Sequence, residues 1–165
     1  MRRVALASCL IASAAGAAPQ LVTARGQWAV LQEGRTCEAA ARSILAPAKD
    51  RPPARASLSF DAGGPRLGQM AVRLSRLPRP GATVQLVVGD QRFLFVSRGD
   101  WAWSRGAVQD RAIIAAMRSA GGMRVEARRP GGGRIVDRYS LDGAPLAIDA
   151  AATCAARLAN RWFFP

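Results

Sequence analysis

The chain has 165 residues, enough for one domain with a substantial core, and it contains no histidine. The lack of histidine excludes Ser-His-Asp and Cys-His triads and histidine metal sites, and neither G-x-x-x-x-G-K-[ST] nor G-x-S-x-G occurs. Lysine and arginine number 24 against 11 acids, a formal net charge of +13. Such a surface attracts anions in a salt-dependent way. We therefore expect a basic protein that is not an enzyme and holds no cofactor or metal.

Residues 1–17 have the pattern of a cleaved secretory signal peptide. Arg2 and Arg3 precede an apolar run of small residues over 4–15, and Ala15-Gly16-Ala17 supplies an A-x-A cleavage site. The segment leading to Cys9 also looks like a lipoprotein lipobox, but only about five apolar residues precede that cysteine, fewer than the roughly 7–15 of a signal peptide. The segment predicts Sec-type export and a periplasmic or outer-membrane-associated protein.

After a flexible leader over 18–27, short runs with alternating or β-rich composition predict strands. These runs are 27–32, 36–41, 56–60, 70–74, 83–88, 91–96, 123–127 and 134–139. Gly89-Asp90 and Gly131-Gly132-Gly133 join two of the pairs as hairpins, because glycine tolerates the positive φ of tight turns. Short strands spaced by turn signals predict an antiparallel β-sandwich over 28–158.

Two helices are expected. The first covers 108–120, with Ser104 as its cap, with Val108, Ala112, Ala115 and Ala116 near one apolar stripe and with Ile113, Ile114 and Met117 beside it. The second follows Pro145, a good residue for the first helical turn, and carries Leu146, Ala150, Cys154 and Leu158 at helical spacing. That spacing predicts that Cys154 faces the core.

Residues 159–165 form a basic and aromatic tail containing Arg161, Trp162, Phe163 and Phe164. Such a tail suits insertion at a membrane interface or contact with a partner. The alternative is that its aromatic rings fold back over the domain, since an exposed apolar patch is a liability in a soluble protein.

Two cysteines remain once the signal peptide is removed, Cys37 and Cys154. An oxidising compartment and an even count favour a structural disulfide between them. Two free buried thiols are the alternative, and a redox pair would more typically show C-x-x-C spacing.

An ordered set of short motifs extends through residues 26–154. The motifs are Gly26-Gln27-Trp28-Ala29-Val30, Arg35-Thr36-Cys37-Glu38-Ala39, Thr83-Val84-Gln85-Leu86, 89–95, Trp101-Ala102-Trp103, 110–118, 137–141 and 147–154. In this order and spacing they resemble the invasion-associated locus B family of exported bacterial proteins. The resemblance implies an immunoglobulin-like β-sandwich in the periplasm or at the outer membrane, with the two cysteines placed as a bridge. It implies no catalytic residues. The chain departs from the family pattern in the plain alanines of 39–41 and in its longer tail.

Taken together, the sequence predicts a mainly β, immunoglobulin-like antiparallel β-sandwich with two short α-helices, acting as an exported non-catalytic envelope or interaction protein. The expected partners are anionic envelope components or another protein, with at most peripheral membrane contact. Nucleic acid is not expected, since an exported chain without a nucleic-acid motif does not meet it. Lys49 is the only lysine, so nearly all of the basic residues are arginine. A GC-rich genome favours arginine codons at solvent-exposed positions, and part of the charge is attributed to this codon usage.

Two other functions stay open. The first is a periplasmic binding module for a small anionic ligand, which needs an arginine-lined pocket. The second is a hydrolase, which needs two carboxylates that meet in space. Arg98-Gly99-Asp100 spells an integrin-recognition tripeptide, but so short a motif recurs by chance and here it falls at an expected turn.

Overall fold

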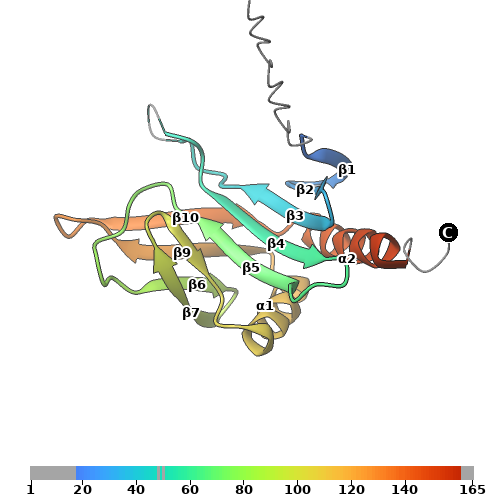
Figure 1. The fold of residues 1–165 in the computed structure, drawn as a ribbon. Coiled ribbons are helices and arrows are strands. Elements are labelled where there is room, and N and C mark those ends of the chain that lie inside the picture. The colour runs from blue at the N-terminus through green and yellow to red at the C-terminus, as the bar shows by residue number, and fades with distance from the viewer. Residues whose placement is uncertain (1–17, 48, 50, 161–165) are drawn as a thin grey trace, which may run out of the picture.

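The computed structural model describes residues 18–47, 49 and 51–160, which form ten strands and two α-helices (Figure 1). The strands are β1 (Gln20–Arg25), β2 (Trp28–Glu33), β3 (Thr36–Arg42), β4 (Arg55–Asp61), β5 (Leu67–Arg73), β6 (Val84–Val88), β7 (Gln91–Arg98), β8 (Trp101–Trp103), β9 (Gly122–Arg128) and β10 (Arg134–Ser140). The helices are α1 (Ala107–Ser119) and α2 (Ala144–Asn160). The predicted mainly β fold with two helices is confirmed.

The strands form one antiparallel sheet in the order β1-β2-β3-β4-β5-β8-β7-β6-β9-β10. Five consecutive strands make the first half, and the hairpins β6–β7 and β9–β10 make most of the second. Short β8 joins the halves by pairing with both β5 and β7. In Figure 1 the strands β3 to β5 run obliquely to β9 and β10. The immunoglobulin-like sandwich stays a prediction.

The first strands also contact β10 at the far end of the sheet order. The indole Nε1 of Trp28 donates to the Ser140 carbonyl at 2.9 Å. The Ile44 amide, just beyond β3, donates to the Arg138 carbonyl at 2.9 Å. The inward residues of both halves accordingly belong to one core, whose fully buried side chains include Trp28, Leu58, Met70, Leu86, Ile113 and Tyr139.

Two turns meet closely where β1–β2 approaches the start of α2. The Gln27 amide donates to the Asp142 carbonyl at 3.2 Å. A Cβ atom on Gly143 would lie 2.0 Å from the Arg25 carbonyl oxygen, and one on Gly26 would lie 2.4 Å from the Asp142 carbonyl oxygen. Both glycines also have positive φ, so conformation and space both require glycine here.

Helix α1 packs through Ala116 and the residues predicted beside the apolar stripe, and the rest of the stripe is exposed. Its buried residues are Asp110, Ile113, Ala116 and Met117, while Val108 is 76% exposed. The Ser104 cap was wrong as well: Gly106 occupies the cap position without a side-chain hydrogen bond. The Ser104 hydroxyl instead donates to the buried Asp110 carboxylate, which also accepts the Met70 amide at 3.0 Å. A buried carboxylate that ties three segments together outweighs the local capping preference.

Helix α2 packs on β2 and β3, and its buried face is mostly alanine. The buried residues are Ala144, Ala147, Ile148, Ala151 and Ala155. Leu146, predicted on the core stripe, is 59% exposed, and Ala150, Cys154 and Leu158 lie at the core margin. Across the interface, Ala39 and Ala41 belong to the buried core, while Ala40 points to the other face of β3 and lines a separate hollow. Small side chains on both elements let helix and strand approach closely, which explains the plain composition of β3.

The flexible leader predicted over 18–27 was wrong for most of its length. Residues 20–25 form strand β1, which pairs with β2 from Gln20 opposite Gln32 to Arg25 opposite Trp28. All six of its residues are exposed, so β1 has no inward apolar face to give the alternating signal that marks a strand. The folded region therefore begins before the predicted boundary at residue 28, and α2 continues past 158 to Asn160.

Candidate functional site

The predicted disulfide is present and joins β3 to α2. Cys37 and Cys154 are bonded with their Cα atoms 6.1 Å apart, across a sequence separation of 117 residues. Cys37 is fully buried among core residues, and Cys154 lies at the core margin. The cysteines are therefore structural, and they are not available as nucleophiles or metal ligands while the bond is intact.

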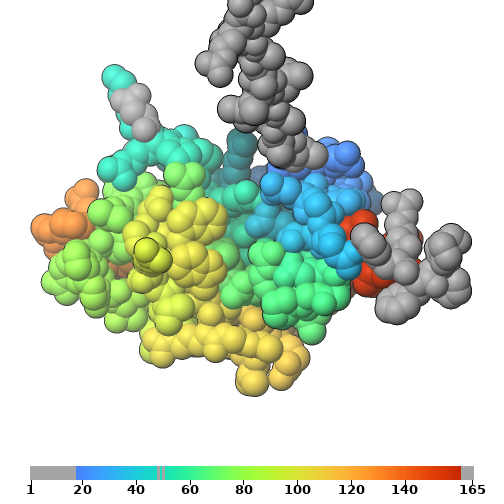
Figure 2. Space-filling model, viewed as in Figure 1, coloured from blue at the N-terminus to red at the C-terminus, as the bar shows by residue number. Residues whose placement is uncertain are grey.

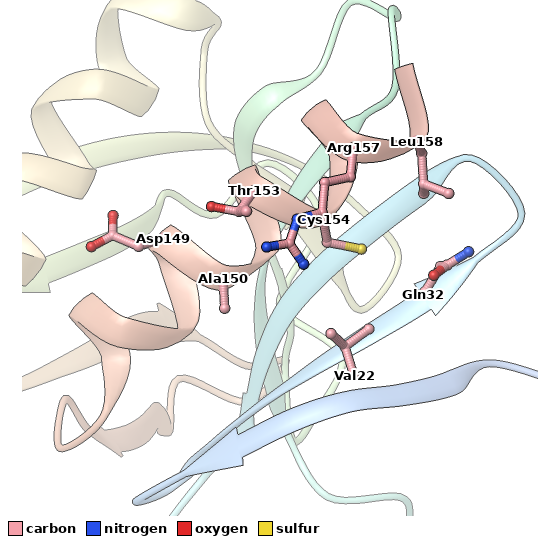
Figure 3. Close-up of a pocket in the computed structure, with 8 residues that line it drawn as sticks. All are labelled: Val22, Gln32, Asp149, Ala150, Thr153, Cys154, Arg157 and Leu158. Carbon is pink, nitrogen blue, oxygen red and sulfur yellow. The ribbon is translucent and has the colours of Figure 1, made fainter. Parts of the chain in front are cut away.

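A cavity of about 560 Å³ lies beside this bond, between α2 and the strands β1 and β2 (Figure 3). Its lining residues are Val22, Gln32, Asp149, Ala150, Thr153, Cys154, Arg157 and Leu158. In Figure 3 Asp149 points away from Val22 and Gln32, and its carboxylate is held by Arg118 at 2.5 Å. Asp149 is the one acid that lines this cavity, so it offers a hollow of mixed polar and apolar residues but no pair of carboxylates for hydrolysis.

Two acids are deeply buried, and both serve backbone amides. Asp110 binds the Met70 amide, as described above, and the Asp137 carboxylate accepts the Ser75 amide at 2.9 Å. Burial raises the pKa of Asp137, and it raises the pKa of Tyr139 as well, with the charge of Asp137 adding to that effect. The Tyr139 hydroxyl is the one buried side-chain polar atom without a hydrogen bond in the described part of the chain. Asp110 ties α1 to β5, Asp137 ties β10 to the segment after β5, and the three groups do not line a shared cavity.

Arginines stand directly opposite one another on the outward face of β9 and β10. The cross-strand pairs are Arg124 with Arg138 and Arg128 with Arg134. On both strands these residues alternate with buried ones. Like charges directly opposite on a sheet destabilise it, so two such pairs in one hairpin are a structural cost. Another row of arginines, Arg42, Arg55 and Arg73, crosses β3, β4 and β5 in the same way.

Few acids offset these arginines. On β9 the Glu126 carboxylate accepts Arg124 Nε at 2.6 Å and lies 3.7 Å from Arg134. The hydrogen bond from Arg124 lowers the pKa of Glu126, against a smaller opposing effect of burial. In the other row Arg55 pairs with Glu38, and Arg73 with Asp100 at 3.1 Å. Exposed Arg138 has no ion pair or side-chain hydrogen bond among residues 18–47, 49 and 51–160.

Two hollows follow the β10 edge on either side of Ile44 and Leu45. The larger, about 420 Å³, is lined by Ile44, Gly89, Gly121, Gly122, Met123, Arg124, Arg138, Tyr139 and Ser140. The smaller, about 150 Å³, is lined by Ser43, Leu45, Ala46, Pro47, Ala54, Ser75, Arg76, Val136 and Asp137. Ile44, Leu45 and the neighbouring Leu77 are 58%, 46% and 51% exposed. We call Ile44, Leu45, Arg76, Leu77, Arg124 and Arg138 the β10 edge surface.

The same end of the molecule gathers further arginines. The loop after β5 is tied to β9 by the Arg79 amide, which donates to the Arg128 carbonyl at 2.7 Å. Figure 2 shows the turn between β9 and β10 and the loop between β5 and β6 side by side at the left of the molecule. Arg76, Arg79 and Arg129 belong to these two segments and Arg128 ends β9 beside them, so the basic surface continues beyond the β10 edge surface.

The sequence predicted the disulfide but not the arginine pairs. The signal was available: a hairpin centred on Gly131 places Arg128 opposite Arg134 and Arg124 opposite Arg138, as the register shows. The predicted contact residues Arg161, Trp162, Phe163 and Phe164 lie outside the described residues. The Arg98-Gly99-Asp100 tripeptide includes the turn between β7 and β8, and its carboxylate is held by Arg73 at 3.1 Å.

No protein-family model, curated protein or solved structure shows a significant match to the chain. Within the described ranges, no cluster of three acids or cysteines could hold a metal ion. Neither helix that the structure describes is long and apolar enough to cross a membrane.

Proposed function

We propose that the chain is an exported, non-catalytic interaction protein of the bacterial envelope, of the invasion-associated locus B type, that contacts anionic envelope components through its arginine surface. The proposal combines the sequence motifs with the charge pattern of the folded chain. Phosphate groups of lipopolysaccharide or of acidic lipids are the anions that such a surface would meet after export.

The two opposed arginine pairs of β9 and β10 carry this proposal. Each pair places two positive charges at neighbouring cross-strand positions, and Glu126 is the one acid on the outward positions of these two strands. An anion bound between opposed arginines would replace repulsion with charge-assisted hydrogen bonds. A surface that retains such pairs is therefore suited to an anionic partner.

The disulfide supports export. Structural disulfides persist in oxidising compartments and are rare where thiols are kept reduced. The Cys37–Cys154 bond ties α2 to β3, so a reducing compartment would remove a tertiary constraint. Together with the signal-peptide pattern over 1–17, this favours a periplasmic or outer-membrane-associated location.

Fractionation of the native bacterium at low and high salt tests the proposal, with intact mass measured on the recovered protein. The proposal expects retention on the outer membrane at low salt and release at high salt. It also expects cleavage near residue 17, a mass two hydrogens below that of the reduced chain, and no lipid on Cys9. Recovery of the protein in the cytosolic fraction with residues 1–17 still attached would contradict the proposal.

Binding of a small anionic ligand is the second candidate function, because a further hollow, on β2 to β4, is lined by two arginines. This hollow of about 490 Å³ is bounded by Gly26, Gln27, Ala29, Leu31, Ala40, Ala41, Arg42 and Arg55. Glu38 already engages Arg55, which leaves Arg42 as the main cation. Titration calorimetry with small phosphates and carboxylates tests it: stoichiometric binding that Arg42→Gln removes would favour this candidate over a surface role.

A further inference from the structure

We propose that the β10 edge surface docks onto a membrane with phosphate-bearing anionic headgroups. Arg124 and Arg138 hold one lipid phosphate, and Ile44 and Leu45 enter the headgroup layer beside it. This inference rests on the proposed function, because it names the envelope component and the face that meets it.

The first observation is the geometry of the arginine pair. Residues directly opposite on antiparallel strands have Cα atoms about 4.5–5.5 Å apart, so Arg124 and Arg138 can reach a single phosphate between them. Arg124 uses its Nε for Glu126, which leaves its terminal N–H groups for another acceptor. Arg138 is exposed and unpaired in the described structure. Guanidinium groups bind phosphate oxygens through paired N–H donors.

The second observation is the hollow in which the pair lies. Arg124 and Arg138 both line the 420 Å³ hollow, and no acid is among the residues around it. Three of those residues are the glycines Gly89, Gly121 and Gly122, which have no side chain to fill the space. A headgroup phosphate can therefore approach the guanidinium groups without meeting a carboxylate that lines the hollow.

The third observation is the apolar pair beside the arginines. The Ile44 amide is bonded to the Arg138 carbonyl, which fixes this pair next to the cationic site. Leu45 lines the adjoining hollow together with Arg76, which precedes exposed Leu77. Exposed apolar side chains flanked by arginines match a membrane–water interface, where hydrocarbon enters the headgroup layer and the cations meet phosphate. Charge complementarity thus selects an anionic lipid surface as the occupant.

The test is co-sedimentation of the exported chain, with its disulfide intact, on vesicles of phosphatidylcholine with and without phosphatidylglycerol. We expect binding to the vesicles that contain phosphatidylglycerol and little to the others. The Arg124→Gln/Arg138→Gln variant should bind these vesicles about 30-fold more weakly, because each basic residue near an anionic surface contributes about 1 kcal/mol. The matched control is Arg105→Gln/Arg111→Gln, which removes the same charge from exposed arginines beside and on α1 and should change binding only a few-fold.

The apolar part has its own pair of variants. Ile44→Ser/Leu45→Ser should weaken binding about tenfold while leaving the dependence on salt unchanged, since burial of apolar side chains is insensitive to screening. Val108→Ser, at an exposed apolar position on α1, should bind like the unmodified chain. Circular dichroism and thermal unfolding confirm that each variant is folded before its binding is compared.

The outcomes separate this inference from the proposed function. If the unmodified chain binds and the β10 edge variants bind as their controls do, another face carries the contact and the inference fails, while the proposed function stands. Loss of binding in Trp162→Ser/Phe163→Ser, with binding retained in Arg124→Gln/Arg138→Gln, would move the contact to the tail and overturn the inference. Absence of binding to either vesicle overturns the inference as well, and salt-dependent retention in fractionated cells then decides the proposed function alone.

Discussion

Two regions of the molecule differ in how they are built: the region that holds α2 against the sheet, and the β10 edge surface. In the first, which we call the α2 clamp, the Cys37–Cys154 bond, two facing sets of alanines and the Gly26–Gly143 contact bring elements as close as atoms allow. At the β10 edge, like charges face each other and large apolar side chains are exposed. The first region gains stability from every contact, and the second retains features that oppose it. The contrast indicates which region serves the fold and which is available to a partner.

The largest expected effect is loss of the disulfide at the α2 clamp. Cys37→Ala/Cys154→Ala should lower the free energy of unfolding by roughly 4–5 kcal/mol in the chain-entropy description, because the bond closes a very long loop. Urea denaturation measures the effect, and chemical reduction of the unmodified chain should reproduce it. If neither the variant nor the reduced chain unfolds at lower urea, the bond is not what fastens α2.

A smaller but still severe effect is expected at the glycine contact. Gly143→Ala places a Cβ against the Arg25 carbonyl, where only 2.0 Å is available, and should cost about 3 kcal/mol or more. Gly99→Ala is the matched control, since Gly99 also has positive φ but has no neighbouring atom within 4 Å. Its cost should be only about 1 kcal/mol. Equal losses in the two variants would show that backbone conformation alone, without the close approach, sets the cost.

The buried carboxylate of β10 predicts a pH effect. Burial raises the pKa of Asp137 above that of the unfolded chain, so its contribution is most favourable at low pH. That contribution is lost as pH rises through the folded-state pKa. Asp137→Asn can keep an oxygen acceptor for the Ser75 amide but cannot ionise. We expect the variant to be more stable than the unmodified chain at neutral pH, with the advantage shrinking toward acid pH, as measured by thermal unfolding across pH.

Asp61 predicts the opposite dependence of stability on pH. The hydrogen bond from Arg66 lowers the pKa of Asp61, against a smaller effect of burial. Its stabilising contribution is therefore present above the unfolded-state pKa and lost as pH falls. The Asp61→Asn variant should accordingly lose the most stability, relative to the unmodified chain, at neutral pH. If the two variants showed the same pH trend, the pKa shifts would not be the cause.

The smallest expected effect comes from a substitution that replaces one positive charge of the β10 edge surface with a negative one. Arg138→Glu places a carboxylate opposite Arg124 and should raise the free energy of unfolding by about 1 kcal/mol at low salt, with the gain fading as salt is added. The same variant should bind anionic vesicles less tightly. Arg105→Glu, which makes the same change of charge away from an opposed arginine, should not show the stability gain.

Local pattern was enough to predict most of the hairpins. The strands β6, β7, β9 and β10 were found because alternation and glycine turns lie close together in sequence. The disulfide followed from compartment and count. Strand β1 was missed because its residues are all exposed. The apolar stripes of the helices were placed only in part, with Val108 and Leu146 exposed, because alanine gives little contrast between a buried and an exposed position.

The arrangement of the strands needed information that lies far apart in sequence. Short β8 pairs with β5 and β7, and β9 pairs with β6 across the whole of α1. These pairings depend on packing that no single segment encodes. The same holds for the β10 edge surface, where Ile44 meets Arg138 across about two-thirds of the described chain. Charge could be counted from the sequence, but its placement required the strand register.

The disulfide also constrains the order in which the protein can mature. In a chain exported as proposed, Cys37 would reach the oxidising compartment 117 residues before its partner, so its thiol would stay unpaired until α2 had been delivered. The alanine face of β3 stays uncovered for the same interval, because α2 is the element that packs on it. Under the proposed export, completion of the N-terminal strands would be tied to the end of translocation, and a truncated chain lacking α2 would leave one unpaired thiol and one uncovered face.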